Sequence, residues 1–242
     1  MAPSRPLFIF DLDNTLYPPD VILWKIVDAR IERYVQERLG VDRDEARNIR
    51  REFLRDFGTT LRGLMHHHGV APAEYLEYVH DVPIPEVVPP RPELGAMLET
   101  LPGRRVVFTN GSESYARRVL AALGVSDLMD GIFGIEFMDY IAKPSPYPYG
   151  KLLQATGAGA GDSLFCEDRY ENLMPAHAMG MYTVWVGGCE DDVPGGREGA
   201  SAPAHAVVPD VCDLPRVLPG FLAGRRPGAT PGRGGKDNGG DR

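Results

Sequence analysis

Short apolar runs recur along the chain and predict the strands of a sheet. They cover residues 7–10, 105–109, 163–166, 181–186 and 204–208. Several of them are apolar at every position, which is typical of strands covered on both faces. Between them, residues 114–123 and 172–179 have helical character, and each segment is followed by a glycine, where helices commonly end. This alternation predicts a parallel, doubly wound α/β sheet.

Residues 18–88 interrupt the alternation with a pattern that predicts helices alone. Two apolar series keep helical spacing there. They are Trp24, Val27, Ile31, Tyr34 and Val35, and then Ala46, Ile49, Phe53 and Phe57. Five prolines between residues 83 and 92 predict a linker or hinge in which a helix cannot easily continue. We therefore expect an α/β core of residues 1–17 and 89–222, with an inserted helical cap of residues 18–88 that moves as a lid.

The composition is that of a folded protein rather than of a disordered or fibrous chain. The 242 residues suit one compact α/β domain with an insertion, and 43% of them are hydrophobic, which is enough to build a core. After Leu222 the chain consists mostly of Gly, Pro, Arg and Asp, which bury too little apolar surface to offset the entropy of ordering. Residues 223–242 are therefore expected to form a disordered tail.

Charge and cysteine content restrict the partners and the compartment. Acidic residues outnumber basic ones by 34 to 26, and the formal charge of -8 disfavours broad contact with polymeric nucleic acid. Cys166, Cys189 and Cys212 follow no zinc-binding spacing, and their odd number fits poorly with a disulfide framework, so we expect a cytoplasmic setting. The first apolar run stops at Asp11 and no run reaches membrane-spanning length, so no membrane contact is expected.

Polar residues follow three of the predicted strands. They are Asp11 and Asp13, Thr109 and Asn110, and Glu167 and Asp168. In open parallel sheets, ligands bind at the carboxyl ends of the strands, so we expect these side chains to share one site. With Lys143 from the loop at residues 142–144, that site would hold four acids, a hydroxyl, an amide and one cation. The set suits phosphoryl transfer with Mg²⁺ on a small phosphorylated metabolite.

The spacing of Asp11 and Asp13 suggests a division of labour between two carboxylates. The Asp11 carboxylate would attack phosphorus and form an acyl-phosphate, which splits hydrolysis into two easier displacements. Asp13 would protonate the leaving alcohol and afterwards take a proton from water. The alternative is an Asx-rich turn in which both residues only satisfy backbone donors. That alternative is weaker, because clustered acids are costly unless a cation neutralises them.

In their order along the chain, these residues resemble the four motifs of the haloacid dehalogenase (HAD) superfamily in its phosphatase form, over about residues 7–222. The segments Asp11-Leu12-Asp13-Asn14-Thr15-Leu16-Tyr17, Phe108-Thr109-Asn110-Gly111, Lys143-Pro144 and Glu167-Asp168 are most similar to the pyrimidine 5′-nucleotidase branch. The resemblance implies a HAD-like Rossmannoid core whose helical cap closes over a nucleoside or another small organic group. It also implies that Asp11 and Asp13 act as described above.

The expected Mg²⁺ ligands are oxygens of these motifs. Asp11, the backbone carbonyl of Asp13 and Asp168 would supply the protein's share, with waters completing an octahedron. Glu167 would bind directly or through water. Many relatives carry two aspartates here, and some have a further acid where this chain has Asn172, so the direct ligand within the Glu167-Asp168 pair stays open.

The remaining motif residues would bind the phosphoryl group. Thr109 and Asn110 offer short hydrogen-bonding groups to its oxygens, and Lys143 offers a compact charge that offsets both phosphate and the Asp11 carboxylate. In isolation, a threonine at a strand end or a single lysine is an ordinary structural or surface residue. Their order relative to the aspartates favours the functional interpretation.

Several other residues invite a functional interpretation that we do not adopt. Tyr17, Trp24 and Tyr34 have rings that could stack on a base, but aromatic residues at helical spacing are more often core. The run 66–68 of three histidines cannot easily converge on one metal ion, because consecutive helical residues point in different directions. Cys166 lies within a run that should be buried, so a cysteine-phosphatase mechanism is disfavoured.

The predicted activity is therefore a Mg²⁺-dependent phosphomonoesterase, a 5′-nucleotidase that hydrolyses pyrimidine nucleoside monophosphates. A phosphatase for phosphoglycolate or a sugar phosphate, or a phosphomutase, differs mainly in contacts made by the cap. A haloacid dehalogenase has no use for the acid at Asp13, which protonates a leaving alcohol. A catalytically silent binding protein would have no chemical need to keep all four motifs.

Overall fold

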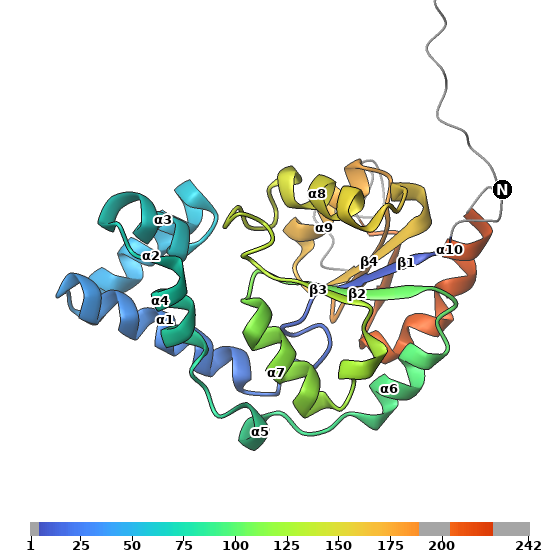
Figure 1. The fold of residues 1–242 in the computed structure, drawn as a ribbon, viewed down its shortest axis with the longest axis horizontal. Coiled ribbons are helices and arrows are strands. Elements are labelled where there is room, and N and C mark those ends of the chain that lie inside the picture. The colour runs from blue at the N-terminus through green and yellow to red at the C-terminus, as the bar shows by residue number, and fades with distance from the viewer. Residues whose placement is uncertain (1–4, 189–203, 225–242) are drawn as a thin grey trace, which may run out of the picture.

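The structure, a computed structural model, describes residues 5–188 and 204–224. Its centre is one sheet with the strand order β3-β2-β1-β4-β5-β6, in which every pairing is parallel (Figure 1). The strands are β1 (Leu7–Phe10), β2 (Arg104–Phe108), β3 (Gly131–Phe133), β4 (Ser163–Glu167), β5 (Tyr182–Val186) and β6 (Ala206–Val208). The predicted doubly wound α/β class is confirmed, and each predicted strand is present within two residues of its expected bounds.

Helices lie on both faces of the sheet and in the insertion after β1. The insertion contains α1 (Leu23–Leu39), α2 (Arg43–Phe57), α3 (Thr60–His68) and α4 (Pro72–His80). Towards β2 and beyond it follow α5 (Ile84–Val87), α6 (Pro92–Glu99), α7 (Glu113–Leu123), α8 (Pro146–Thr156), α9 (Tyr170–Ala178) and α10 (Leu218–Gly224). The short 3₁₀ turns are η1 (Ser126–Leu128), η2 (Ala160–Asp162) and η4 (Val211–Arg216).

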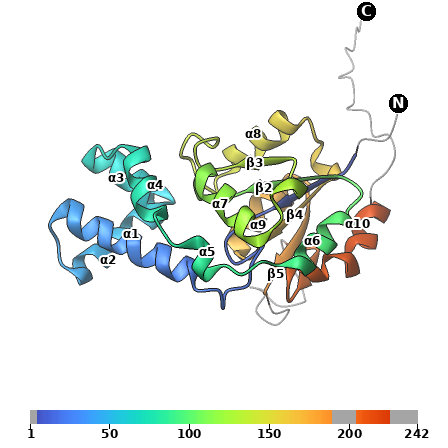
Figure 2. The same ribbon diagram turned by 60° about the horizontal axis from the view of Figure 1, so that its bottom comes forward.

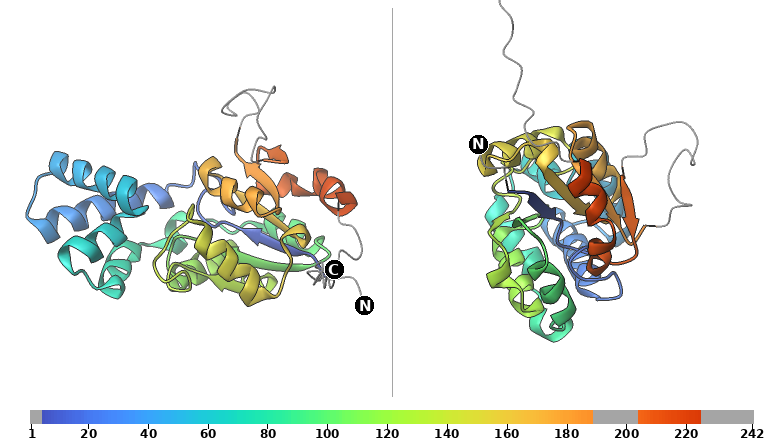
Figure 3. Two further views of the ribbon diagram at one scale, coloured as in Figure 1. Left: turned by 90° about the horizontal axis from the view of Figure 1, so that it is seen from above. Right: turned by 90° about the vertical axis from the view of Figure 1, so that its right-hand side faces the viewer.

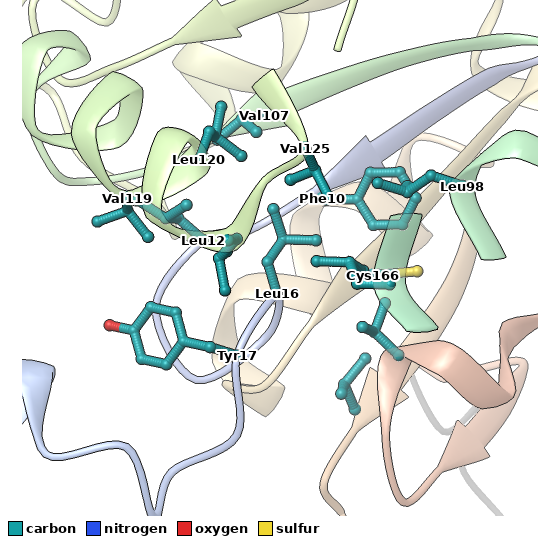
Figure 4. Packing of buried hydrophobic residues seen from close by; sticks show 14 of the residues in the cluster. Phe10, Leu12, Leu16, Tyr17, Leu98, Val107, Val119, Leu120, Val125 and Cys166 are labelled. Atoms are coloured by element: carbon teal, nitrogen blue, oxygen red, sulfur yellow. The ribbon is translucent and has the colours of Figure 1, made fainter. Parts of the chain in front are cut away.

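Side chains of β1 alternate between two apolar clusters, one on each face of the sheet. Phe8 and Phe10 pack with residues of α6 and α7, whereas Leu7 and Ile9 pack with residues of α8 and α9. Figure 1 shows α6 and α7 on one side of the strands and α8 and α9 on the other. Figure 4 shows part of the first cluster, with Phe10 close to Leu98 of α6. Burial on both faces explains why β1 is apolar at every position.

The inserted helices α1 to α4 pack on one another, with α1 against α2 and α4, and α2 against α3. Figures 2 and 3 show them gathered at one end of the molecule rather than on a face of the sheet. The side chains of Asp42 and Thr59 accept hydrogen bonds at the starts of α2 and α3. Gly40 and Gly58 end α1 and α2 in the left-handed conformation that glycine favours. The sequence therefore marks where α1 and α2 end and where α2 and α3 begin.

One strand was not predicted, and two short helices begin at prolines of the predicted linker. The edge strand β3 has only three residues, all half-buried, and no apolar run marks it in the sequence. The proline-rich linker holds the four-residue α5, with Pro85 in its first turn, and Pro92 opens α6, so these helices begin at or beside prolines rather than continue through them. The first helical turn tolerates proline, because its N–H groups have no intrahelical partner.

Some predictions fall partly or wholly outside the described residues. Of the predicted tail 223–242, residues 223 and 224 end α10, and residues 225–242 lie outside the description, as does Cys189. Cys166 and Cys212 are free thiols. Among the helices of the described ranges, none combines the length and apolar character that a membrane span requires.

Candidate active site

Three strand ends meet at the centre of the sheet. β1 pairs with β2 on one side and with β4 on the other, so the residues that follow these strands become neighbours. Phe10 pairs with Cys166, and the backbone N–H of Asp11 donates to the carbonyl of Cys166 at 2.9 Å. This register places Asp11 beside Glu167, the last residue of β4. The order of the strands reverses at β1, which is where open α/β sheets bind ligands.

A tight turn after β1 presents the two aspartates. The carbonyl of Leu12 accepts hydrogen bonds from the backbone N–H groups of Thr15 and Leu16. Asn14 has a φ of 57°, a left-handed conformation that asparagine tolerates better than most residues. Leu12 and Leu16 are fully buried, which anchors the turn to the core. Asp11 is therefore held rigidly at the edge formed by the carboxyl ends of the central strands, hereafter the sheet edge.

Lys143 is the only cation among the predicted site residues, and its ammonium group is fully satisfied. Nζ donates to Asp11 Oδ1 at 2.7 Å, to Glu167 Oε2 at 2.7 Å and to the Phe108 carbonyl at 2.8 Å. Its side chain is 1% exposed, and the Asp11 and Glu167 side chains are 9% and 1% exposed. A lysine has three N–H donors, and here each has an acceptor. The residue joins β1, β2 and β4 electrostatically.

The residues after β2 support this arrangement. The side-chain amide of Asn110 donates to the Lys143 carbonyl at 3.1 Å and accepts from the Lys143 N–H at 2.9 Å. Thr109 is buried, and its Oγ1 accepts from the N–H of Gly111 at 3.0 Å, so its hydroxyl proton can still be donated. Asn110 therefore orients Lys143 in this structure, and its predicted contact with phosphate stays a prediction.

Three carboxylates form one cluster at the sheet edge. Oxygens of Asp11, Glu167 and Asp168 all lie within 4.8 Å of one another. Glu167 uses Oε2 to accept from Lys143 and Oε1 to accept from the N–H of Arg169 at 3.1 Å. Hard oxygen donors in this number suit Mg²⁺, which keeps several of its own waters. Coordination of Mg²⁺ by the backbone carbonyl of Asp13 stays a prediction.

Burial dominates the electrostatics of the cluster. Burial, followed by the charge of Glu167, raises the pKa of Asp11 to about 7, although Lys143 acts against this shift. Burial also raises the pKa of Glu167 to about 7, and burial with the charge of Asp11 raises that of Asp168 to about 6. Burial alone would lower the pKa of Lys143, but Asp11 and Glu167 together raise it. The raised pKa values of the three carboxyl groups indicate that their ionised forms would be favoured by further positive charge nearby.

Asp13 has a separate environment. Its Oδ1 accepts hydrogen bonds from the hydroxyls of Tyr17 at 2.5 Å and Tyr115 at 2.7 Å. Burial, followed by the charge of Asp11, raises the pKa of Asp13 to about 6, while the two tyrosines lower it. The neighbouring aspartates therefore have different partners, a lysine for Asp11 and phenols for Asp13.

All seven predicted site residues line one cavity of about 460 Å³, together with residues of the inserted helices. The helices contribute apolar groups such as Val27 and Leu61 and the polar pair Arg50 and Asp28, whose side chains are hydrogen-bonded to each other. The sequence did not identify these residues, because helical periodicity separates a buried face from an exposed one but does not mark which residues face a cavity.

Two buried polar atoms in the cavity wall have no hydrogen-bond partner among the described residues. They are Arg50 Nε and Asn172 Oδ1. Asn172 is 3% exposed. The only signal for it in the sequence is its position four residues after Asp168 in the fourth motif.

The residues for which we did not adopt a functional role lie in different environments. Tyr34 is core, packed edge-on against Tyr75 and Tyr78, whereas Trp24 is 39% exposed and lines the cavity. The three histidines at the end of α3 are exposed, and none belongs to a metal-ligand cluster in the described part of the chain. Burial raises the pKa of the Cys166 thiol above its ordinary range, which disfavours a thiolate nucleophile.

Comparison with known proteins defines the class. Residues 6–180 match the family described as haloacid dehalogenase-like hydrolases. The match covers well over half of the 242 residues, so the chain belongs to the haloacid dehalogenase-like hydrolase family. Phosphate metabolism protein 8 of Saccharomyces cerevisiae is 26% identical over 194 residues, which is 74% of this chain. The match spans 60% of the length of that relative.

Solved structures share the fold. A HAD phosphatase from Thermococcus onnurineus superposes with a TM-score of 0.57 at 18% identity, covering 88% of this chain and 97% of its own. The Bacillus subtilis protein YfnB, described as a HAD-hydrolase and solved with magnesium, gives 0.58 at 15%, covering 89% and 99%. L-2-haloacid dehalogenase from Xanthobacter autotrophicus gives 0.56 at 20%, covering 90% and 99%. At these identities the similarity establishes the fold alone.

Proposed function

We propose that the protein is a Mg²⁺-dependent phosphomonoesterase that acts through an aspartyl-phosphate on Asp11. The observation that carries this proposal is the pairing of two aspartates with different surroundings at one sheet edge. Asp11 lies within a cluster of acids and beside Lys143, whereas the Asp13 carboxylate, two residues away, accepts hydrogen bonds from the phenols of Tyr17 and Tyr115. Two carboxylates with different environments are suited to different roles in one reaction.

In the first step, an Asp11 oxygen attacks phosphorus as the bond from phosphorus to the ester oxygen breaks. Asp13, which must then be protonated, gives its proton to that leaving oxygen. In the second step, Asp13 takes a proton from water as the water attacks phosphorus, and the bond between phosphorus and Asp11 breaks. Thr109 would donate to the phosphoryl oxygens, where negative charge concentrates, and the Lys143 ammonium would offset the charge of the phosphoryl group and of Asp11. The products are the alcohol and inorganic phosphate, and the enzyme returns to its starting state.

The acidic cluster fits a divalent cation. Asp11 and Asp168 would hold Mg²⁺ directly, together with the Asp13 carbonyl, and Mg²⁺ would neutralise charge on the phosphoryl group. Hydrogen bonds from protein groups already engage both oxygens of Glu167, which favours Asp168 over Glu167 as the direct ligand. Glu167 would then act through water and hold Lys143 in place.

For the substrate, we propose a nucleoside monophosphate, with pyrimidine nucleotides preferred. A cavity of about 460 Å³ is within the range of sites for small organic ligands, and its wall combines apolar groups with the polar pair Arg50 and Asp28. The name of the yeast relative refers to phosphate metabolism but gives no substrate. Phosphoglycolate or a sugar phosphate is the second candidate, because the same sheet-edge residues would process either one.

The proposal includes the organisation inferred from the sequence. Residues 18–88 would act as a cap that selects the leaving group, and residues 1–17 and 89–222 would form the catalytic core. A cytoplasmic location and the absence of nucleic-acid and membrane partners belong to the same proposal. They rest on the charge, the cysteine pattern and the lack of long apolar runs.

A substrate screen tests the proposal. Purified protein is offered pyrimidine and purine monophosphates, sugar phosphates and phosphoglycolate, with and without Mg²⁺, and free phosphate is measured. The proposal predicts release that requires Mg²⁺, stops with chelator and is fastest for pyrimidine monophosphates. A preference for a non-nucleotide would overturn the substrate assignment alone. Full activity in excess chelator would overturn the metal-dependent mechanism.

A further inference from the structure

Two tyrosines from different elements converge on the same oxygen of Asp13. Tyr17 lies four residues further along the turn after β1, and Tyr115 lies in the first turns of α7. Both are fully buried, yet both hydroxyls point to the partly buried Asp13 carboxylate. We infer that Tyr17 and Tyr115 are positioning residues that fix Asp13 so that one defined oxygen performs proton transfer.

The ring of Tyr17 is anchored in the apolar core. It belongs to the same buried cluster as Leu12 and Leu16, and Figure 4 shows its hydroxyl turned away from Leu16. Because the ring is fully enclosed, the hydroxyl cannot follow Asp13 if the carboxylate rotates. The core thereby sets the position of the first donor.

Tyr115 is fixed from two sides. Its backbone N–H donates to Oγ of Ser112, the N-cap of α7, at 3.2 Å. Its ring stacks on His80, at the end of α4, with a centroid distance of 4.2 Å and an interplanar angle of 14°. His80 in turn contacts Ser112, since Nδ1 and Oγ are 3.0 Å apart. The second donor is therefore held by the helix that follows β2 and by the last inserted helix.

The geometry assigns different tasks to the two oxygens of Asp13. Oδ1 accepts two hydrogen bonds, so the acid form of Asp13 carries its proton on Oδ2. That proton would pass to the ester oxygen as the bond to phosphorus breaks, and Oδ2 would later receive a proton from water. Rotation of the carboxylate would break both hydrogen bonds at once. This inference rests on the proposed function, because proton transfer by Asp13 is the step that the tyrosines serve.

A structural role has a different signature. Tyrosines that only satisfy a buried carboxylate would affect folding, or would slow all substrates equally. Tyrosines that position a general acid matter most when the leaving group needs a proton. Phenyl phosphate and p-nitrophenyl phosphate form a suitable pair of probes, since they are similar in size and p-nitrophenolate leaves without protonation far more readily than phenolate.

The experiment compares Tyr17→Phe, Tyr115→Phe and the control Tyr34→Phe with wild type in the presence of Mg²⁺. Tyr34 is also buried and also donates to a carboxylate, that of Glu74 at 3.1 Å, but it does not line the cavity. The rate constant of the first step is measured by rapid mixing as release of the phenol. In the two test variants we expect a fall of about tenfold or more with phenyl phosphate. We expect a change within about twofold with p-nitrophenyl phosphate, and KM values close to wild type.

The outcomes separate the inference from the proposed function. Equal losses with both substrates, or test variants that behave like Tyr34→Phe, would overturn the inference and leave the proposed function intact. A wild-type protein that hydrolyses neither these probes nor any ester of the substrate screen would overturn both. The tyrosines lie on different elements and are tested singly, so the test does not depend on one variant folding. In an Asp13→Ala background the same substitutions should change the first step by less than about twofold, and a larger loss there would count against positioning.

Discussion

The cavity has two ends that are built differently. At the sheet edge, Lys143 and Glu167 have side chains that are 1% exposed, and every donor of the lysine has an acceptor. At the end formed by the inserted helices, Trp24 is 39% exposed, Leu54 is 47% exposed and the side chain of Asp28 is 49% exposed. The first end holds a buried lysine with all its donors paired, whereas the second end includes side chains that are open to solvent.

This contrast suits the two ends of the cavity to different roles in the proposed reaction. Buried charges with fixed partners need no reorganisation when charge develops during a reaction, so the sheet edge suits the chemistry that all substrates share. Exposed groups on helices can vary with little effect on folding, so the other end suits recognition of the leaving group. Substitutions at the two ends should therefore differ in size and in kind.

The largest effect is expected at the sheet edge from Asp11→Asn. Without the carboxylate no acyl-phosphate forms, so kcat should fall by at least about 1,000-fold while the fold is retained. Phosphate release and far-UV circular dichroism measure the two properties. Asp127→Asn, an exposed residue of η1, is the matched control and should retain wild-type activity. Wild-type turnover in Asp11→Asn would show that the two ends do not divide the work in this way.

Lys143→Met should have the next largest effect. Removing the cation leaves the buried Asp11 and Glu167 carboxylates without their shared partner, which should reduce the free energy of unfolding by about 3 kcal/mol. Activity should fall by about 100-fold or more, since the positive charge that offsets the phosphoryl group and Asp11 is lost. Denaturant titration in chelator measures the stability. Lys151→Met removes a 30% exposed lysine paired with Asp139 and should leave the free energy of unfolding close to that of wild type. Equal costs would contradict the contrast in pairing.

A smaller and selective effect is expected at the other end from Arg50→Gln. If Arg50 contacts the leaving group, the KM for the best nucleotide should rise about tenfold, while p-nitrophenyl phosphate, which has no group to reach Arg50, should be little affected. Arg51→Gln alters the next residue of α2, which is exposed and outside the cavity wall, and serves as the control. Parallel losses on both substrates would place Arg50 in the packing of α1 against α2 rather than in recognition.

The smallest effect concerns His80, which connects the two ends through its stacking on Tyr115. Burial, followed by the charge of Arg118, lowers the pKa of His80 from its ordinary 6.5 to about 3. Between these values the unfolded chain binds a proton that the folded protein does not, so stability is lost as pH falls through about 6.5. From about pH 7 to about pH 5.5 this contribution is about 1 kcal/mol.

The variant His80→Asn should remove this share of the pH dependence, because asparagine does not titrate. The control His67→Asn alters an exposed histidine outside the cavity wall. Both are measured as the free energy of unfolding against pH. Identical slopes in His80→Asn and wild type would show that His80 is protonated in the folded state.

The two ends also differ in how well the sequence predicted them. Asp11, Thr109 and Glu167 were identifiable because each ends or follows a short strand that contains an apolar run, and parallel strands bring such positions to one edge. The order of the motifs then added Lys143, whose loop carries no strand signal of its own. The meeting of these side chains in one cavity was therefore predictable before any coordinates were known.

Arg50 and Tyr115 could not be predicted in the same way. Arg50 lies in a helix rich in charged residues, where periodicity does not distinguish a cavity-lining arginine from a solvated one. Tyr115 occurs within an ordinary amphipathic helix, and its contact with Asp13 spans 102 residues. The half-buried edge strand β3 was missed because three residues carry too little pattern. Long-range contacts and short elements need coordinates.

The central claim is a covalent bond between phosphorus and Asp11, and chemical trapping tests it most directly. Wild-type protein is mixed with Mg²⁺ and a substrate that it hydrolyses, quenched in acid within one turnover, reduced with borohydride and digested for mass spectrometry. The account predicts homoserine at position 11, the reduction product of an aspartyl-phosphate, and none in Asp11→Asn. An unmodified Asp11 in protein that has turned over its substrate, or a modification at another acid, would contradict it.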